Sequence, residues 1–232
     1  MKCSKNWQIL WGIFLLFLFN SSIYSQSCCS NKILTDKCTV VIVGKDASTD
    51  GSVMTTHTCD CGLCDWTWRY VPPADYEPTA KRKIYYFNQF KTDPPEMGLK
   101  WSAIADNFNG LEITQVEHTY GYKHGDFGYM NDNQVALGES TIGCRDEMEN
   151  QTPTPKFDIT MLTLIAIERA KTARHAIKIM GELAEKYGYG HTDTGEMLAL
   201  ADPDEAWIFE IMPVGPLWTP QSEKPGAIWC AQ

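Results

Sequence analysis

Cys38 is the residue whose type and position are best suited to covalent chemistry. It opens a strand-like run, CTVVIVG over 38–44, and it follows a polar stretch over 26–37. A cysteine at the first position of a mature chain carries a nucleophilic thiol and also an α-amino group, whose pKa of about 8 makes it a usable base at neutral pH. From spacing alone, the alternative is an ordinary cysteine that is buried or held in a disulfide.

Three of the nine cysteines lie close together in the sequence. Cys59, Cys61 and Cys64 form CDCGLC, a spacing that also occurs in metal sites. No second C-x-x-C or H-x-x-x-H segment follows to complete a zinc site. In an exported chain we therefore expect disulfides, with metal ligation or thiols as the alternatives, and we predict neither a metal nor an organic cofactor. The pairing of the cysteines does not follow from the sequence.

The first thirty residues have the pattern of an export signal. Lys2 and Lys5 precede an apolar run over 7–19, and the polar stretch over 20–27 offers small residues for cleavage. The apolar run is shorter than the roughly 20 residues that cross a bilayer as a helix. We therefore interpret residues 1–25 as a signal peptide and 26–37 as a propeptide, with an uncleaved anchor as the alternative. The sequence predicts a secreted or extracytoplasmic protein without a stable membrane partner.

The charge of the chain excludes several classes of partner. The 232 residues include 20 Lys and Arg against 29 Asp and Glu, a formal net charge of −9. Nucleic acids and anionic membranes both favour clustered Lys and Arg, and the chain has no basic run of five or more residues. A length of this order predicts one domain, which we place at 38–232, and a homo-oligomer is left open.

Alternation and periodicity predict an α+β fold. A helix pair is expected at 158–170 and 172–187, with Asp158 as an N-cap and Gly188 ending the second helix. Asp46 to Ser52 has turn chemistry, so the first two strands are expected to form a hairpin. Strands before and after a helix pair predict a sheet covered by a helical hairpin. The strands are expected at 38–44, 53–58, 83–90, 111–120, 134–139, 196–201 and 206–212.

Five blocks of the sequence, in order, carry a resemblance to one family. They are CTVVIVGKDASTDGSVMTTHTCD (38–60), QVEHTYGY (115–122), YMNDNQVALGEST (129–141), IERAKTARHAIKIMGELAEKYGY (167–189) and GEMLALADPDEAWIFE (195–210). Together they resemble the dipeptidase family of N-terminal-nucleophile cysteine hydrolases, which are relatives of secernins and more distantly of penicillin V acylase. The resemblance covers nearly all of the chain after Lys37.

The resemblance implies a fold and a set of roles. It implies part of an αββα sandwich, with Cys38 exposed as the nucleophile after autocatalytic removal of the preceding peptide. Asp60 would hold the α-amino group, with a turn aspartate between two cysteines as its alternative. The Asn131 amide would stabilise the tetrahedral oxyanion, with a hairpin-turn residue as its alternative. Glu139 and Arg145 would face the substrate or serve the structure.

Two departures from the family pattern stand out. Where relatives read Arg-Asn-Glu-Asp, this chain has His57-Thr58-Cys59-Asp60. His57 would lie near the substrate, and because a histidine can be neutral at pH 7, activity is expected to be weaker or more dependent on pH. The family is also roughly twice as long, so the chain resembles its N-terminal half and is interpreted as C-terminally truncated.

The function predicted from these observations is that of a secreted cysteine-type dipeptidase. Dipeptides or small peptides would be hydrolysed by acyl transfer to Cys38, without a cofactor. One alternative is an acylase of non-peptide amides, which the same nucleophile would serve. The other is a non-catalytic truncated remnant.

Overall fold

The computed structural model describes residues 38–59, 68–86, 108–149, 154–190 and 194–232, all within the unit Asp36–Gln232. The predicted signal peptide, the predicted propeptide and Asp60 lie outside the described residues. Among the described residues, no helix is both long and apolar enough to cross a membrane.

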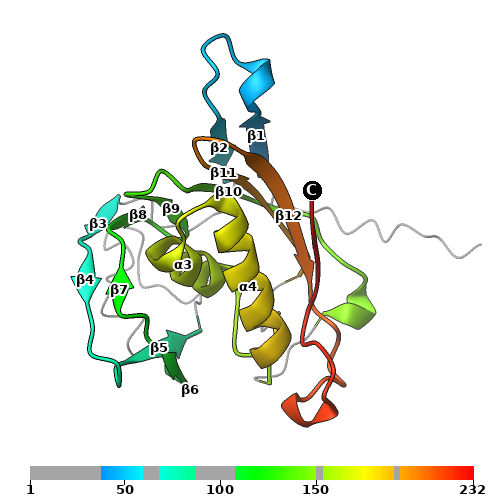
Figure 1. Cartoon of the computed structure of the whole chain (residues 1–232). Helices are drawn as coiled ribbons and strands as arrows, with labels where there is room; N and C mark the ends of the chain where they lie inside the picture. Colours follow the sequence, from blue (N-terminus) through cyan, green and yellow to red (C-terminus); the bar gives the residue numbers. More distant parts are fainter. Residues whose placement is uncertain (1–37, 60–67, 87–107, 150–153, 191–193) are drawn as a thin grey trace, which may run out of the picture. The chain divides into compact units, whose positions relative to one another are not determined.

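The first described element is a β-hairpin (Figure 1). Strands β1 (Thr39–Val43) and β2 (Met54–Thr58) pair antiparallel, from Thr39 opposite Thr58 to Val43 opposite Met54. The density of β-branched residues favours extended backbone here. Gly51 has a φ of 76° in the connection, a conformation that glycine adopts without steric cost. The hairpin predicted from the sequence is confirmed.

A seven-stranded antiparallel sheet, in the order β13-β12-β11-β10-β9-β8-β3, forms the centre of the fold. Two further pairs, β4 with β7 and β5 with β6, are separate two-stranded sheets. The bounds are β3 (Arg69–Val71), β4 (Ala74–Asp75), β5 (Lys81–Tyr85), β6 (Phe108–Thr114), β7 (His118–Thr119), β8 (Tyr122–His124), β9 (Gly128–Asn131), β10 (Ala136–Thr141), β11 (Glu196–Ala201), β12 (Ala206–Met212) and β13 (Ile228–Ala231).

Two α-helices lie side by side against this sheet, α3 (Ile159–Arg169) and α4 (Ala173–Tyr187) (Figure 1). The predicted N-cap of α3 is confirmed, because the Asp158 carboxylate accepts the Met161 N–H at 2.7 Å. Helix α4 has an N-cap too: the Thr172 hydroxyl accepts the His175 N–H at 3.1 Å. Gly188, with a φ of 82°, ends α4. Three short 3₁₀ turns of this fold are Lys45–Ala47, Asp146–Met148 and Pro220–Ser222.

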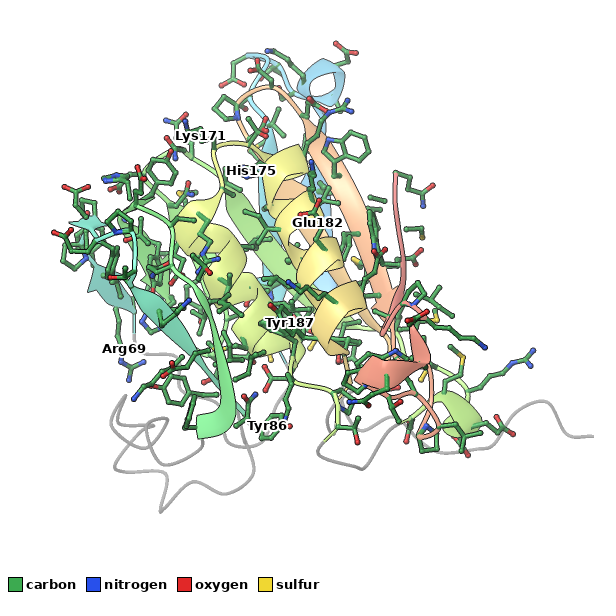
Figure 2. All side chains as sticks on the ribbon, turned by 60° about the horizontal axis from the view of Figure 1, so that its bottom comes forward. Arg69, Tyr86, Lys171, His175, Glu182 and Tyr187 are labelled. Atoms are coloured by element: carbon green, nitrogen blue, oxygen red, sulfur yellow. The ribbon has the colours of Figure 1, made fainter. Side chains whose placement is uncertain are left out.

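The two helices differ in how much of their surface is buried. Almost every residue of α3 is buried, whereas α4 buries one face and exposes the other. Figure 2 shows His175 and Glu182 along α4, with Lys171 in the preceding loop. His175 is exposed, and partial burial together with the nearby positive charges of Lys171 and Lys178 lowers its pKa. Helix α4 is therefore an amphipathic surface helix, as its periodicity predicts.

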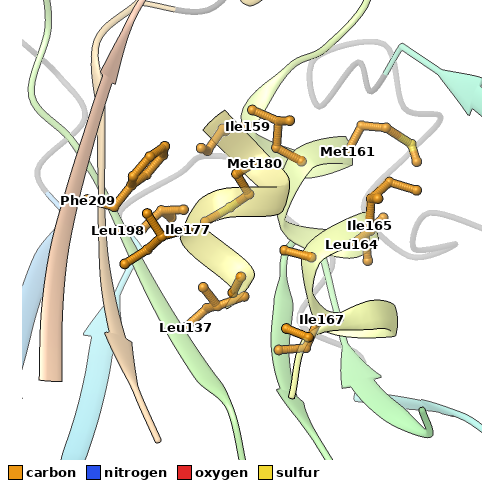
Figure 3. Close-up of a cluster of buried hydrophobic side chains, with 14 of the residues drawn as sticks. Leu137, Ile159, Met161, Leu164, Ile165, Ile167, Ile177, Met180, Leu198 and Phe209 are labelled. Carbon is orange, nitrogen blue, oxygen red and sulfur yellow. The ribbon is translucent and has the colours of Figure 1, made fainter. Parts of the chain in front are cut away.

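The main core lies between the helices and one face of the sheet. Figure 3 shows Ile177 and Met180 of α4 facing Leu198 of β11 and Phe209 of β12. Leu198, Phe209 and Met180 are fully buried. Burial of a side chain of this size contributes about 2 kcal/mol to folding, so this interface holds the helix pair to the sheet.

The hairpin packs against the opposite face of the same sheet. Successive strand residues point to opposite faces, so Gly138 points away from the face that Leu137 shares with the core. A Cβ at Gly138 would lie 3.2 Å from Thr55 Oγ1 and 3.4 Å from His57 Cβ, both in β2. The Thr55 hydroxyl also donates to the Ala199 carbonyl at 3.3 Å. The layers are therefore helix pair, sheet and hairpin, in agreement with the α+β class.

The sequence placed most long elements correctly and missed the short ones. Strands β11 and β12 have the predicted bounds, whereas the strand predicted at 111–120 is divided into β6 and β7. The division follows Thr114, where Gln115 turns its side-chain oxygen to the Val116 N–H at 2.8 Å and to Arg169 at 2.8 Å. The strand predicted at 83–90 begins earlier, as β5, and its residues 87–90 lie outside the described part of the chain.

Candidate active site

Cys38 lies immediately before the first residue of β1 and is half-buried. The Ser140 hydroxyl of β10 donates to the Cys38 carbonyl at 3.2 Å. The next residue, Thr39, donates its N–H to the Thr58 hydroxyl at 3.2 Å, across the hairpin. Both strands that flank Cys38 therefore fix its backbone, and the thiol occupies the open end of the hairpin.

The hairpin register places Cys59 beside Cys38. Because Thr39 is opposite Thr58, the residues one step further out on each strand are neighbours at the open end. Glu139 of β10 completes a cluster: the two Sγ atoms and a Glu139 carboxylate oxygen all lie within 4.8 Å of one another. Cys59 is half-buried, and the Glu139 side chain is only 3% exposed. Two thiols and a buried carboxylate therefore share one small volume.

His57 holds the backbone of Glu139 in this site. The Glu139 N–H donates to His57 Nδ1 at 2.9 Å, and the Glu139 carbonyl oxygen lies 3.1 Å from the same nitrogen. Since a backbone N–H can only donate, Nδ1 is the acceptor of this bond. The ring also meets Phe127 and Tyr129 edge-on, with centroids 6.3 and 6.1 Å away. At this position the chain therefore has a half-buried imidazole, where an arginine would bring a permanent positive charge.

Asn131 is the last residue of β9, before the turn to β10; its side chain is buried, and all of its side-chain hydrogen-bonding groups are engaged. Nδ2 donates to the carbonyls of Ile167 and Ala170, at 2.9 and 2.7 Å, near the end of α3. Oδ1 accepts the N–H groups of Asn133 and Val135, at 3.0 and 3.1 Å. These bonds match the alternative interpretation of Asn131 as a turn residue, and its oxyanion role stays a prediction.

Arg145 and Asp60 are not brought to this cluster in the described part of the chain. Arg145 is exposed at the start of the 3₁₀ turn Asp146–Met148, after β10. Its side chain has neither a hydrogen bond nor an ion pair with the described residues. Asp60 lies outside them, so its predicted role as partner of the α-amino group stays a prediction. Cys61 and Cys64 also lie outside them, and disulfide formation by these cysteines likewise stays a prediction.

Comparison with known proteins identifies the family. The model of Peptidase family C69 matches residues 37–232. The chain belongs to this family. The resemblance inferred from the five sequence blocks is thereby confirmed, and this C69 chain is a member of a peptidase family.

Curated relatives of the C69 chain carry dipeptidase names. It is 24% identical over 188 residues to Probable dipeptidase B of Streptococcus pyogenes serotype M1, covering 75% of this chain and 33% of that protein. It is 25% identical over 178 residues to Probable dipeptidase of Salmonella dublin, covering 75% and 37%. It is 26% identical over 186 residues to Probable dipeptidase A of S. pyogenes serotype M1, covering 77% and 36%. The chain spans about a third of the length of these relatives.

Sequence reasoning missed two groupings in the C69 chain. Cys59 was not predicted to lie beside Cys38, although the register of the predicted hairpin makes these two residues neighbours. Sequence reasoning also missed the buried Glu168, which lies 3.2 Å from Arg82 and 3.3 Å from Arg169. No local motif marks that network, because Arg82 and Glu168 are 86 positions apart.

Two cavities lie away from the cluster. One cavity, of about 390 Å³, is lined by residues that include Arg82, Glu168 and Tyr122. Burial raises the pKa of the Tyr122 phenol well above its usual range. The other, of about 620 Å³, is lined largely by apolar side chains such as Leu217 and Trp229 near β13. Neither cavity is lined by Cys38, Cys59 or Glu139.

Proposed function

We propose that this C69 chain is a cysteine-type dipeptidase whose nucleophile is Cys38. The observation that carries the proposal is the position of this thiol: it is half-buried immediately before the first residue of β1, one residue after the family match begins at residue 37. The names of the curated relatives support dipeptides as the substrate class.

The proposed reaction begins with removal of the peptide that precedes Cys38. The new α-amino group then takes the proton of the thiol, and Sγ attacks the carbonyl carbon of the scissile peptide bond. The protonated amine returns this proton to the leaving amino group as the carbon–nitrogen bond breaks, which leaves a thioester. Water, deprotonated by the same amine, then hydrolyses the thioester and frees Sγ for the next cycle.

The neighbours of Cys38 support the positioning that this reaction needs. Ser140 and Thr58 fix the backbone on both sides of the thiol, so the distance and orientation between the nucleophile and the amine would stay constant. Asp60 remains the proposed partner of the amine. The stacking of the hairpin on the sheet, with helices beyond it, is compatible with the proposed αββα N-terminal-nucleophile fold.

The first experiment tests maturation and hydrolysis together. Intact-mass measurement and N-terminal sequencing are expected to find a chain that begins at Cys38, and Cys38→Ala should block both the cut and dipeptide hydrolysis. Cys230→Ser, at an exposed thiol in β13, is the matched control and should retain both. A mature chain that begins elsewhere, or a Cys38→Ala variant that still hydrolyses dipeptides, would contradict the proposal.

The same preparation separates the two amide substrates. Dipeptides and acyl amides are supplied side by side at equal concentration, and we expect faster turnover of the dipeptides. Faster turnover of the acyl amides would identify an acylase instead.

We also propose that the protein is exported, on the strength of the charged and apolar pattern over 1–25. Fractionation of the cells that produce it should recover the mature chain outside the cytoplasm. Recovery of an uncut chain in the cytoplasm would contradict export.

A further inference from the structure

We propose that Cys38, Cys59 and Glu139 bind a thiophilic divalent cation such as zinc, and that the bound ion prevents nucleophilic attack by Cys38. Binding itself requires only the folded chain. The inhibitory consequence rests on the proposed function of Cys38.

The first support is the geometry of the three donor atoms. Zinc binds thiolate sulfur at about 2.3 Å and carboxylate oxygen at about 2.0–2.2 Å, so tetrahedral ligand atoms are separated by roughly 3.5–3.8 Å. The two Sγ atoms and the Glu139 oxygen already lie within 4.8 Å of one another. Rotation of the side chains by a fraction of a turn would close the remaining distance around an ion.

The second support is the nature of the donors. Cysteine sulfur and carboxylate oxygen are both zinc ligands, whereas magnesium and calcium favour oxygen ligands alone. When all three groups are ionised they bring three negative charges into a site where Glu139 is only 3% exposed. Burial and mutual repulsion oppose that charge, and a divalent cation would neutralise most of it.

The third support is the rigidity of the backbone that carries the ligands. His57 accepts the N–H of Glu139 at 2.9 Å, and Ser140 donates to the carbonyl of Cys38 at 3.2 Å. Cys38 and Cys59 occupy the two strand ends of one hairpin. Contacts of this kind, made by groups behind the ligands, orient a metal site and strengthen it.

The site leaves one tetrahedral position for a water molecule. In a chain that begins at Cys38, the α-amino nitrogen could take that position and close a five-membered ring through the thiolate. In either case Sγ of Cys38 donates its electron pair to the metal, so it is unavailable for attack on a carbonyl carbon. Removal of the metal restores the thiol without any change in oxidation state.

The test uses the full chain under reducing conditions, with cobalt(II) and zinc as probes. Cobalt should give a thiolate-to-metal charge-transfer band that zinc abolishes by displacement. Cys38→Ser and Cys59→Ser should each weaken that band, and Glu139→Gln should lower zinc affinity at least about tenfold, since even residues behind the ligands are worth 10–100-fold. Cys230→Ser, outside the cluster, should bind both metals like the wild type. Circular dichroism and urea unfolding establish that each variant is folded.

The double variant Cys61→Ser/Cys64→Ser decides between two sites. It should retain metal binding if Cys38, Cys59 and Glu139 form the metal site. Loss of binding in this variant, with unchanged binding in Cys38→Ser and Glu139→Gln, would assign the metal to CDCGLC and overturn the proposal. Failure of the folded wild-type chain to bind either metal would overturn it as well.

A second readout concerns inhibition. Zinc should inhibit dipeptide hydrolysis reversibly, with recovery on addition of a chelator, and Cys59→Ser should remain active at zinc concentrations that silence the wild type. Equal zinc sensitivity of Cys59→Ser and the wild type would refute silencing through this site. If the chain hydrolyses no dipeptide at all, the cobalt spectrum still decides whether the metal site exists. Failure of the proposed dipeptidase function can therefore be distinguished from failure of the proposed metal site.

Discussion

Replacing Asn131 by Asp separates a structural role from a catalytic one with almost no change in shape. The substitution keeps the oxygen that accepts from Asn133 and Val135, but it puts a second oxygen where Nδ2 donates to the carbonyls of Ile167 and Ala170, at 2.9 and 2.7 Å. Two hydrogen bonds are lost, and each is worth about 1 kcal/mol. The buried oxygen also faces two carbonyl oxygens. The expected loss in the free energy of unfolding is about 3–5 kcal/mol, against a total of about 5–15 kcal/mol.

Urea unfolding, followed by tryptophan fluorescence, measures this loss. With a slope of about 2 kcal/mol per molar, the midpoint of Asn131→Asp should fall by about 2 M. Asn133→Asp is the matched control, because within the described part of the chain the Asn133 amide donates a single bond, at 3.2 Å, to the Ala170 carbonyl. Its loss should be about 1 kcal/mol. An unchanged midpoint in Asn131→Asp, together with a large fall in kcat, would refute the structural role and support the oxyanion role.

Three further predictions concern stability. Gly138→Val should lower the unfolding free energy by about 2 kcal/mol, because the hairpin must move away from a side chain that contacts Thr55. Gly44→Ala, which has open space around the new side chain, should change the unfolding free energy little. Glu168→Gln should cost about 3 kcal/mol, since two arginines lose their buried partner; a neutral result in urea would contradict this. Burial raises the pKa of Tyr86 to about 12. The unfolding free energy of the wild type should therefore fall by about 1 kcal/mol relative to that of Tyr86→Phe between about pH 10 and 12. Parallel pH profiles of the two proteins would contradict this prediction.

The sign of the Tyr86 effect follows from proton binding. The unfolded phenol ionises at about pH 10, whereas the folded phenol keeps its proton until about pH 12. Between these values the folded state binds more protons, so rising pH favours unfolding. The contribution is fully present below pH 10 and is lost as the pH passes through 12. The phenol is about half-buried, which limits the effect to the modest size given.

The elements that could be predicted from sequence are those whose patterns repeat. Helix α4 shows apolar residues at three- and four-residue spacing over four turns, and β11 and β12 are apolar runs joined by a turn around Pro203. Strands β3, β4, β8 and β9 have two to four residues each, too few for alternation to be recognised. Their pairing depends on neighbours that are distant in the sequence.

The candidate site was predictable to a similar extent. Cys38 could be singled out because a strand start, a polar leader and a family resemblance coincide there. Its proximity to Glu139 could not, since it depends on how the hairpin lies on β10, which small residues at Gly138 and Ala199 allow. Asn131 shows the opposite difficulty: a buried amide has the same sequence signature whether it holds a turn or contacts a substrate.

The ladder between β1 and β2 has a consequence for maturation. Every pair in it, from Thr39 opposite Thr58 to Val43 opposite Met54, lies on the C-terminal side of Cys38. A cut between Lys37 and Cys38 would therefore break none of these pairs, and the Ser140 bond to the Cys38 carbonyl would also survive it. The uncut and cut chains would share one scaffold. Activation of this kind would change the chemistry of a single nitrogen atom and leave the architecture that surrounds it in place.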